Sequence, residues 1–303
     1  MFAKLSSYRQ GLLQVDRQLA ITLPHINPKQ HGDRRVEHNA LFAFWNAAWR
    51  RFTAQCPEAQ RIHSLLEAAG ERTIRNDHVA LRTFNLDNIN RRRVGAIFER
   101  HGYLRVPETL HFPDKHLTAD YYIHSDEFQP KVFISELSVE AMPSEAQQWI
   151  RSVTADARLE GLGSLLAPTW QPVRYADYLR FAELSEYAAW TAAFGIQINH
   201  FAILCNQLHK FPELRNLNRW LLANQCQLNR AGGVVKGSEK ELLLQSATMA
   251  SQVKHLFAGG YETVPGCFYE FAQRFNIECS GTPYQGFRVD NAKNIFESTS
   301  KFY

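Results

Sequence analysis

The chain has 303 residues, of which 45% are hydrophobic and 12% aromatic; this excludes a disordered protein and suits one large domain or two fused modules. Lys and Arg number 34 against 30 Asp and Glu, and no basic stripe interleaved with aromatics follows, so we expect no nucleic-acid partner. No run of about 18 apolar residues and no apolar signal-peptide core occurs. We therefore expect no membrane association and a cytoplasmic location.

The five cysteines are an odd number and form no CxxC pair. This pattern argues against both a disulfide framework and a thiolate zinc cluster. It is typical of a protein in a reducing compartment.

The N-terminal region, residues 1–75, is expected to be helical. Apolar positions recur at spacings of three and four in 41–52 and in 59–70, and the second stretch closes on Gly70. A first module follows over residues 76–142. It reads as strand, helix, strand, strand, strand, at 77–84, 87–102, 103–106, 119–124 and 131–137.

Residues 143–196 read as a helical insert, and residues 197–303 as a second module with a C-terminal tail. The second module repeats the first order of elements, with expected segments at 198–206, 211–226, 231–238, 242–250 and 266–275. The helix expected at 211–226 is amphipathic, with four leucines on one side.

The two first strands also match residue by residue. DHVAL at 77–81 and NHFAI at 199–203 each read polar, His, apolar, Ala, apolar, and the fourth strands carry Glu136 and Glu270. Agreement in element order and in residues favours a duplication. We therefore predict an α+β fold in which two paired βαβββ modules form a cupped sheet, with the helical N-terminal region and the helical insert added.

A cup of this kind brings the inward faces of the first and fourth strands together, and with them His78, His200 and a carboxylate. Two imidazoles and one carboxylate form a metal site that leaves positions open for substrate and dioxygen. These donors suit Fe(II), Mn(II) or Zn(II) about equally. Glu136 is expected to be a non-ligand that pairs with a basic group or lines the pocket. The plain alternative is that each histidine is a structural core residue.

Arg82 shares the inward face of its strand with His78. A buried guanidinium needs an anionic partner, which is either an acid such as Glu136 or a substrate carboxylate. We predict the second, with Arg82 as a substrate-binding catalytic residue. Ser246, and Thr248 beside it, are expected to add hydroxyl donors to the substrate site.

At DHVALR, NHFAIL and CFYEFAQR the sequence resembles the vicinal-oxygen-chelate superfamily, and the last motif is similar to the glutamate-bearing end strand of 4-hydroxyphenylpyruvate dioxygenase. The whole chain resembles the bacterial 2-oxoadipate dioxygenase/decarboxylase family. By this resemblance His78, His200 and Glu270 match the iron ligands, and Arg82 matches the arginine that holds the substrate.

The resemblance implies Fe(II), with zinc or nickel as alternative occupants of the purified protein. It also implies dioxygen and a small 2-oxo dicarboxylic acid as partners, conversion of 2-oxoadipate to 2-hydroxyglutarate with loss of carbon dioxide, and a context in lysine catabolism. Three other functions stay open: another vicinal-oxygen-chelate dioxygenase, a zinc-dependent hydrolase, and a small-molecule binding protein without catalysis.

Overall fold

The structure is a computed structural model, and it describes residues 32–299. Residues 1–31 of the expected helical N-terminal region, and the last four residues of the expected tail, lie outside this part. No helix in the described part is long and apolar enough to cross a membrane.

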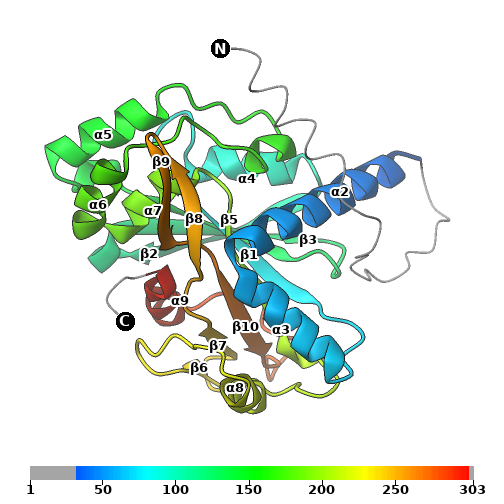
Figure 1. The fold of residues 1–303 in the computed structure, drawn as a ribbon. Helices are drawn as coiled ribbons and strands as arrows, with labels where there is room; N and C mark the ends of the chain where they lie inside the picture. Colours follow the sequence, from blue (N-terminus) through cyan, green and yellow to red (C-terminus); the bar gives the residue numbers. More distant parts are fainter. Residues whose placement is uncertain (1–31, 300–303) are drawn as a thin grey trace, which may run out of the picture.

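Eight strands form one mixed sheet, in the order β2-β3-β4-β1-β5-β10-β7-β6 (Figure 1). The first half contains β1 (Asn76–Phe84), β2 (Tyr103–Phe112), β3 (Leu117–His124) and β4 (Lys131–Leu137). The second half contains β5 (Ile198–Leu204), β6 (Lys236–Ser238), β7 (Leu243–Ala247) and β10 (Phe268–Arg274).

The two halves repeat one topology. In each, the first strand pairs in parallel with the last, and β1 pairs antiparallel with β5 to join the halves. The crossover helices are α4 (Arg91–Glu99) in the first half and α8 (Leu214–Ala223) in the second. The expected α+β fold of paired βαβββ modules is confirmed.

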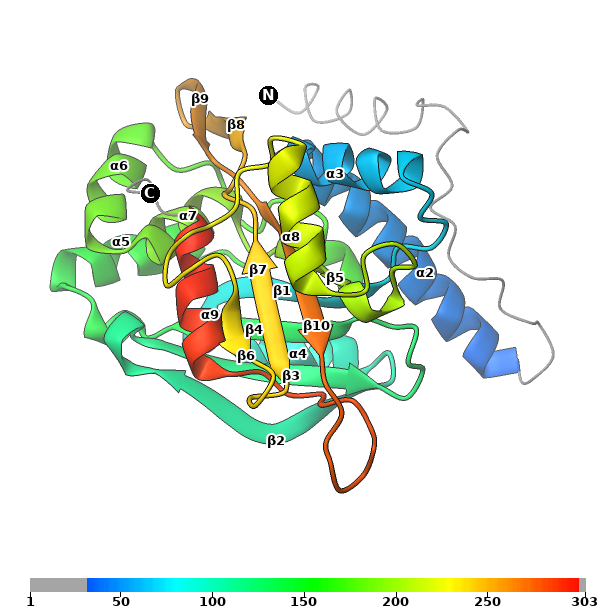
Figure 2. The same ribbon diagram turned by 90° about the horizontal axis from the view of Figure 1, so that it is seen from below.

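The helices before β1 and in the insert pack against the sheet or against one another. Those that precede β1 are α2 (Gly32–Gln55) and α3 (Pro57–Ala68), and those of the insert are α5 (Ser144–Thr154), α6 (Tyr175–Leu184) and α7 (Glu186–Phe194). Of these, α2, α3 and α7 pack against the sheet, and α5 and α6 pack against α7. Single-turn helices are η1 (Pro113–Lys115), η2 (Val139–Ala141), η3 (Leu162–Leu165), η4 (Cys205–Gln207) and η5 (Phe296–Thr299). Helix α9 (Val289–Ile295) lies along β6 and β7 in Figure 2, in a region expected only as a tail.

Two local expectations differ from the structure. The helix expected from Asp87 begins at Arg91, because the Asn90 side chain accepts hydrogen bonds from the backbone N–H groups of Arg92 and Arg93. A hairpin, β8 (Gln252–Phe257) and β9 (Gly260–Pro265), separates β7 from β10 and was not expected. It forms a separate two-stranded sheet that projects from the main one in Figure 1.

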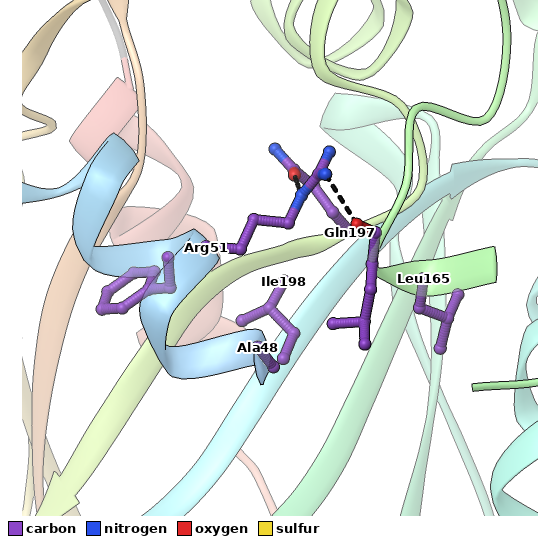
Figure 3. A pocket seen from close by; sticks show the side chains of 7 residues that line it. Ala48, Arg51, Leu165, Gln197 and Ile198 are labelled. Atoms are coloured by element: carbon purple, nitrogen blue, oxygen red, sulfur yellow. Dashed lines mark hydrogen bonds between the residues drawn. The ribbon is translucent and has the colours of Figure 1, made fainter. Parts of the chain in front are cut away.

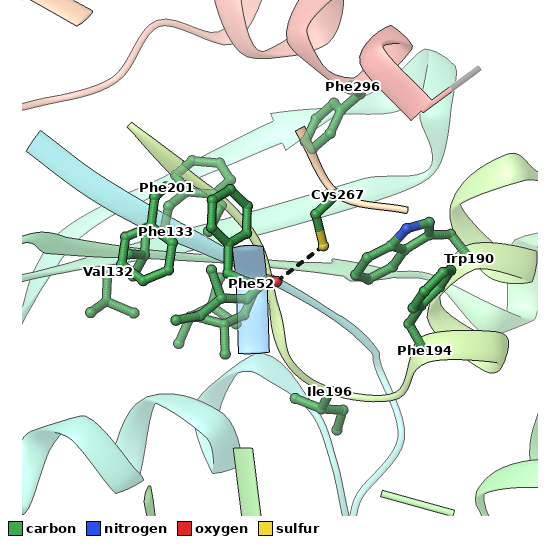
Figure 4. Close-up of a cluster of buried hydrophobic side chains, with 14 of the residues drawn as sticks. Phe52, Val132, Phe133, Trp190, Phe194, Ile196, Phe201, Cys267 and Phe296 are labelled. Atoms are coloured by element: carbon green, nitrogen blue, oxygen red, sulfur yellow. Dashed lines mark hydrogen bonds between the residues drawn. The ribbon is translucent and has the colours of Figure 1, made fainter. Parts of the chain in front are cut away.

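The outer face of the second half packs against the N-terminal helices. The rings of Phe52 on α2 and Phe201 on β5 lie 5.0 Å apart, and Trp49 packs edge-on against Phe201 at 5.2 Å. The same buried cluster extends to Trp190 and Phe194 on α7, stacked 4.9 Å apart (Figure 4). These aromatic contacts hold the outer face of β5 against α2.

Candidate metal centre

Three potential metal ligands converge on the inner face of the sheet. His78 on β1, His200 on β5 and Glu270 on β10 are all buried, and they offer ligand atoms within 4.8 Å of one another. His78 Nε2 lies 3.4 Å from Glu270 Oε1, and His200 Nε2 lies 3.2 Å from Glu270 Oε2. Both imidazoles thus aim the same ring nitrogen at one carboxylate.

Strand register explains this convergence. Ala202 lies opposite His78 on one side and beside Glu270 on the other, while Ala80 lies opposite His200. Paired residues share a face, so the three ligands and the two alanines all point inward. The small alanine side chains leave space between the ligands that a larger residue would fill.

A matching irregularity precedes each histidine. The β1–β5 pairing shifts register between Asn76 and His78 and again between Ala80 and Leu81, which leaves Asp77 and Asn199 unpaired as bulge residues. Asp77 Oδ2 lies 2.8 Å from His78 Nδ1, and Asn199 Oδ1 lies 3.2 Å from His200 Nδ1. Each side-chain oxygen can accept a hydrogen bond from Nδ1–H and so leave Nε2 as the nitrogen with a free lone pair.

Asp77 is itself held by two cations. Arg274 donates two hydrogen bonds to its carboxylate, at 2.6 and 2.8 Å, and Lys131 Nζ lies at 3.4 Å. Burial would raise the pKa of Asp77, but the charges of Arg274 and Lys131 hold it well below its usual value. Burial likewise lowers the pKa of Lys131 to about 8, although Asp77 opposes the shift.

The Glu270 carboxylate has one paired and one unpaired oxygen. Its Oε1 accepts a hydrogen bond of 2.6 Å from Gln245 Nε2, and Asn291 Nδ2 in turn donates to Gln245 Oε1. Its Oε2 is buried without a hydrogen-bond partner among the described residues. Burial disfavours the charge, yet His78 and His200 keep the pKa of Glu270 far below its usual value.

The two histidines differ in basicity. Burial lowers the pKa of His78, but Glu270 and Asp77 outweigh burial and raise it overall. For His200 burial dominates, so its pKa falls below the usual value and the ring favours its neutral form.

The donor set fits a divalent metal ion. Two imidazole Nε2 atoms and a carboxylate with an unpaired buried oxygen surround one point, and each imidazole has an acceptor at Nδ1 that orients it. A metal ion among them would satisfy the oxygen that the protein leaves unpaired.

Glu136 lies on the other face of the sheet, away from this cluster. It accepts hydrogen bonds from the backbone N–H and the guanidinium of Arg91 at the start of α4. The prediction that it pairs with a basic group is confirmed. Its assignment as the counterpart of Glu270 in the first repeat is wrong. Ala80 and Ala202 are equivalent in the two repeats; Ala202 pairs with Glu270, whereas Ala80 pairs with Phe133, so Phe133 occupies the place of Glu270.

Arg82 faces inward, as expected, and is 1% exposed. Its Nη1 lies 3.1 Å from Glu186 Oε1 on α7 and its Nη2 donates to Thr299, while the guanidinium lies over the rings of Tyr187 and Trp190. Its ion-pair partner is therefore Glu186 and not Glu136. The Nε–H group remains buried without a partner among the described residues.

Ser246 points away from the cluster, contrary to its expected role in substrate binding. On β7 it alternates with Gln245, which reaches Glu270, so Ser246 faces outward and donates a hydrogen bond to Asn218 on α8. Thr248 lies past the end of β7, where its hydroxyl accepts a hydrogen bond from the Tyr269 backbone.

Residue type alone did not reveal Asp77, Asn199 and Gln245 as neighbours of the ligands. Asp77 immediately precedes His78 in the first repeat, and Asn199 immediately precedes His200 in the second. This polar residue at the same place in both repeats was the available signal. Phe287 also contacts the centre, its ring lying 4.9 Å from that of His78.

A second hollow in the described part of the chain is too small to hold a substrate. It lies between α2 and the segment before β5, and Arg51 spans it by donating to Gln197 and to the Leu166 carbonyl (Figure 3). Its volume is about 10 Å³, which is room for one water molecule at most.

The curled sheet of paired βαβββ modules, with a histidine on each first strand and a glutamate on the last, defines a protein of the vicinal-oxygen-chelate class. Residues 160–279 match the family model described as 2-oxoadipate dioxygenase/decarboxylase. The chain is 32% identical over 271 residues to the chloroplastic 2-oxoadipate dioxygenase/decarboxylase of Arabidopsis thaliana, covering 80% of this chain and 73% of the relative.

Solved structures agree. Hydroxyglutarate synthase from Oryza sativa, in complex with 2-oxoadipate, is 28% identical, with a TM-score of 0.81 over 93% of this chain and 98% of that one. A protein from Shewanella frigidimarina, described provisionally as a hydrolase, is 37% identical, with a TM-score of 0.74 over 82% and 97%. The chain belongs to the 2-oxoadipate dioxygenase/decarboxylase family.

Proposed function

We propose that this protein is an Fe(II)-dependent dioxygenase/decarboxylase that converts 2-oxoadipate and dioxygen to 2-hydroxyglutarate and carbon dioxide. The observation that carries the proposal is the inward-facing cluster of His78, His200 and Glu270 in a chain of this family. Bound Fe(II) would supply Lewis-acid and redox chemistry, with coordination positions left open for a 2-oxo acid and dioxygen.

The chain itself would hold and orient the substrate. Arg82 shares β1 with His78, and Ala80, two residues before Arg82, lies opposite His200. The Nε–H group of Arg82 is buried without a partner among the described residues. Together with a terminal N–H group of the same guanidinium, it can bind a carboxylate by two parallel hydrogen bonds. Glu186, whose side chain is 30% exposed, forms the present ion pair with Arg82. A substrate carboxylate would either displace Glu186 or bind the guanidinium alongside it.

The surroundings of the centre would exclude water. The Phe287 ring covers His78 and lies 5.0 Å from the ring of Phe133, and both histidines are buried. Exclusion of water strengthens the electrostatic interactions between the chain and a charged substrate.

A cytoplasmic location is also proposed; the matched Arabidopsis relative is chloroplastic.

Metal-dependent turnover tests this proposal and separates it from a zinc hydrolase. Metal-free protein would be loaded with Fe(II) under anaerobic conditions, or with Zn(II), and each form would be mixed with 2-oxoadipate in air. We expect 2-hydroxyglutarate from the iron form alone. Turnover by the zinc form, or by the iron form without oxygen, would contradict the proposal.

A further inference from the structure

Arg274 is a buried cation at the end of β10 that joins two parts of the fold beside the metal centre. Its side chain is 3% exposed. Nε and Nη2 donate to the two carboxylate oxygens of Asp77, at 2.6 and 2.8 Å. Nη1 donates to the backbone carbonyls of Tyr284 and Gly286, at 2.9 and 2.8 Å. One guanidinium therefore bridges the first module and the C-terminal segment.

Through Asp77, this arginine acts on one of the candidate ligands. Asp77 Oδ2 lies 2.8 Å from His78 Nδ1, on the opposite side of the ring from the Nε2 that faces Glu270. A fork of two parallel N–H groups holds both oxygens of a carboxylate and so fixes its plane. Lys131, the other cation at Asp77, lies 3.4 Å from one of the two oxygens. Arg274 is thus the group that orients the acceptor of His78.

Through the C-terminal segment, the same arginine holds the ring that covers His78. Gly286, whose carbonyl accepts from Arg274, immediately precedes Phe287. The guanidinium carbon lies 5.3 Å from the centre of the Phe287 ring, and that ring packs edge-on against the His78 imidazole at 4.9 Å. His78 is therefore held at Nδ1 and at its ring by two groups that Arg274 positions.

Within the described part of the chain, the second histidine is held differently. Its acceptor, Asn199, is a neutral amide whose Nδ2 is buried without a hydrogen-bond partner among the described residues. Strand register makes Phe133 the equivalent of Glu270. Leu137 and Arg274 each lie four residues further along, so an aliphatic residue takes the place of the arginine in the first module. Arg274 is therefore not a shared feature of the two modules.

We propose that Arg274 is a positioning residue of the metal centre. It acts through Asp77 and through the segment that carries Phe287, and it keeps the His78 imidazole in the orientation in which Nε2 can bind a metal ion. None of the four hydrogen bonds described above goes to a metal ligand, so its effect on the metal is indirect. This inference rests on the proposed function, because it takes His78 as a ligand.

The test measures the Co(II) affinity of the metal-free full chain, followed by the visible absorption of bound Co(II), in the wild type, Arg274→Gln and Arg274→Lys. Lysine keeps the charge but not the fork, and it is the variant to measure if Arg274→Gln does not fold. Arg91→Gln is the matched control, because it removes a partly buried arginine from Asp120 and Glu136 on the other face of the sheet. Urea unfolding of each metal-free protein reports stability separately.

We expect Co(II) affinity to fall about 10- to 100-fold in both Arg274 variants, as for other groups that orient a ligand. EDTA should also remove the metal faster, because Phe287 is held less firmly. Arg91→Gln should lose stability and keep wild-type Co(II) affinity. Wild-type affinity in either Arg274 variant, or an equal loss in Arg91→Gln, would overturn the positioning role alone. A wild type that binds no Co(II) would overturn the metal centre and the proposed function with it.

A double-mutant cycle tests the route through Asp77. Asp77→Asn gives the first module the amide that the second module has at Asn199. Because residues that act through one another are not additive, Arg274→Gln should weaken Co(II) affinity several-fold less in the Asp77→Asn protein than in the wild type. Equal losses in the two proteins would overturn the action of Arg274 through Asp77.

Discussion

At the scale of single residues, the histidines divide by their surroundings. His78 and His200 are buried, each has an oxygen acceptor at Nδ1, and each points Nε2 at Glu270. His209 is exposed, and its contact with Glu71 is made by its backbone N–H. Exposure and orientation, rather than residue type, set the two candidate ligands apart.

His200→Ala should abolish stoichiometric metal binding, because it removes one of three protein ligands. We expect His209→Ala to bind metal like the wild type. Iron content after anaerobic loading and desalting is the measurement. Full iron occupancy in the His200 variant would contradict the proposed ligand set.

Arg82→Ala should lower kcat/KM for 2-oxoadipate by the equivalent of about 2–5 kcal/mol, because a buried charge-assisted contact is lost. Arg82→Lys keeps the charge without the fork and should also be poor. Kinetics of both variants, with iron content checked alongside, provide the test. Normal kinetics in a fully iron-loaded Arg82→Ala protein would leave the arginine only its structural ion pair with Glu186.

Lys236 should make stability depend on pH. Its pKa is about 8 in the folded protein, and about 10.4 is usual for an unfolded chain. Between these values the unfolded state binds the extra proton, so this residue's contribution to stability rises with pH from about 8 to 10.

The measurement is urea unfolding of the wild type and Lys236→Met in metal-free form at several pH values. The free energy of unfolding of the wild type should increase relative to the variant across that window. A constant difference between the two proteins would show that the pKa of Lys236 is not lowered by folding.

At the scale of elements, β7 shows how strand alternation separates function from packing. Gln245 faces the centre and donates to Glu270, whereas its neighbour Ser246 faces outward and donates to Asn218. The hydroxyl of Ser246 suggested a substrate contact, but its register against β10 places it on the outer face. Because the β8–β9 hairpin lies between β7 and β10 in the chain, the sequence does not reveal the register of β7 against β10.

Neighbouring substitutions on β7 should therefore have opposite consequences. Gln245→Leu removes the donor to Glu270 and should weaken metal affinity about 10- to 100-fold, as for other groups that orient a ligand. Ser246→Ala should leave metal affinity unchanged and lower the free energy of unfolding by about 1–3 kcal/mol, because Asn218 loses a buried partner.

Metal titration and urea unfolding of both proteins would distinguish these effects. Reduced metal affinity in Ser246→Ala would show that the outer face also contributes to the centre.

At the scale of the whole molecule, the internal repeat was readable because both first strands carry the same His-x-Ala pattern, and this made the cluster of His78, His200 and Glu270 predictable. The pairing of Glu136 with Glu270 was not correct, because the offset between strands depends on register that spacing along the chain does not reveal.

Contacts made by segments distant in the sequence could not be predicted either. Glu186 contacts Arg82 from a helix 104 residues further along the chain, and Phe287 covers His78 from a segment expected only as a tail. No local pattern around Arg82 or His78 indicates these contacts. They follow from how the insert and the C-terminal segment pack onto the inner face.

The central claim is that this centre couples dioxygen to decarboxylation of a 2-oxo acid. The most direct measurement follows oxygen consumption and carbon dioxide release together when the Fe(II)-loaded protein meets 2-oxoadipate, with His200→Ala as the control. The account predicts one oxygen consumed for each carbon dioxide released and each 2-hydroxyglutarate formed, and no turnover by the control. Carbon dioxide release without oxygen consumption would contradict it.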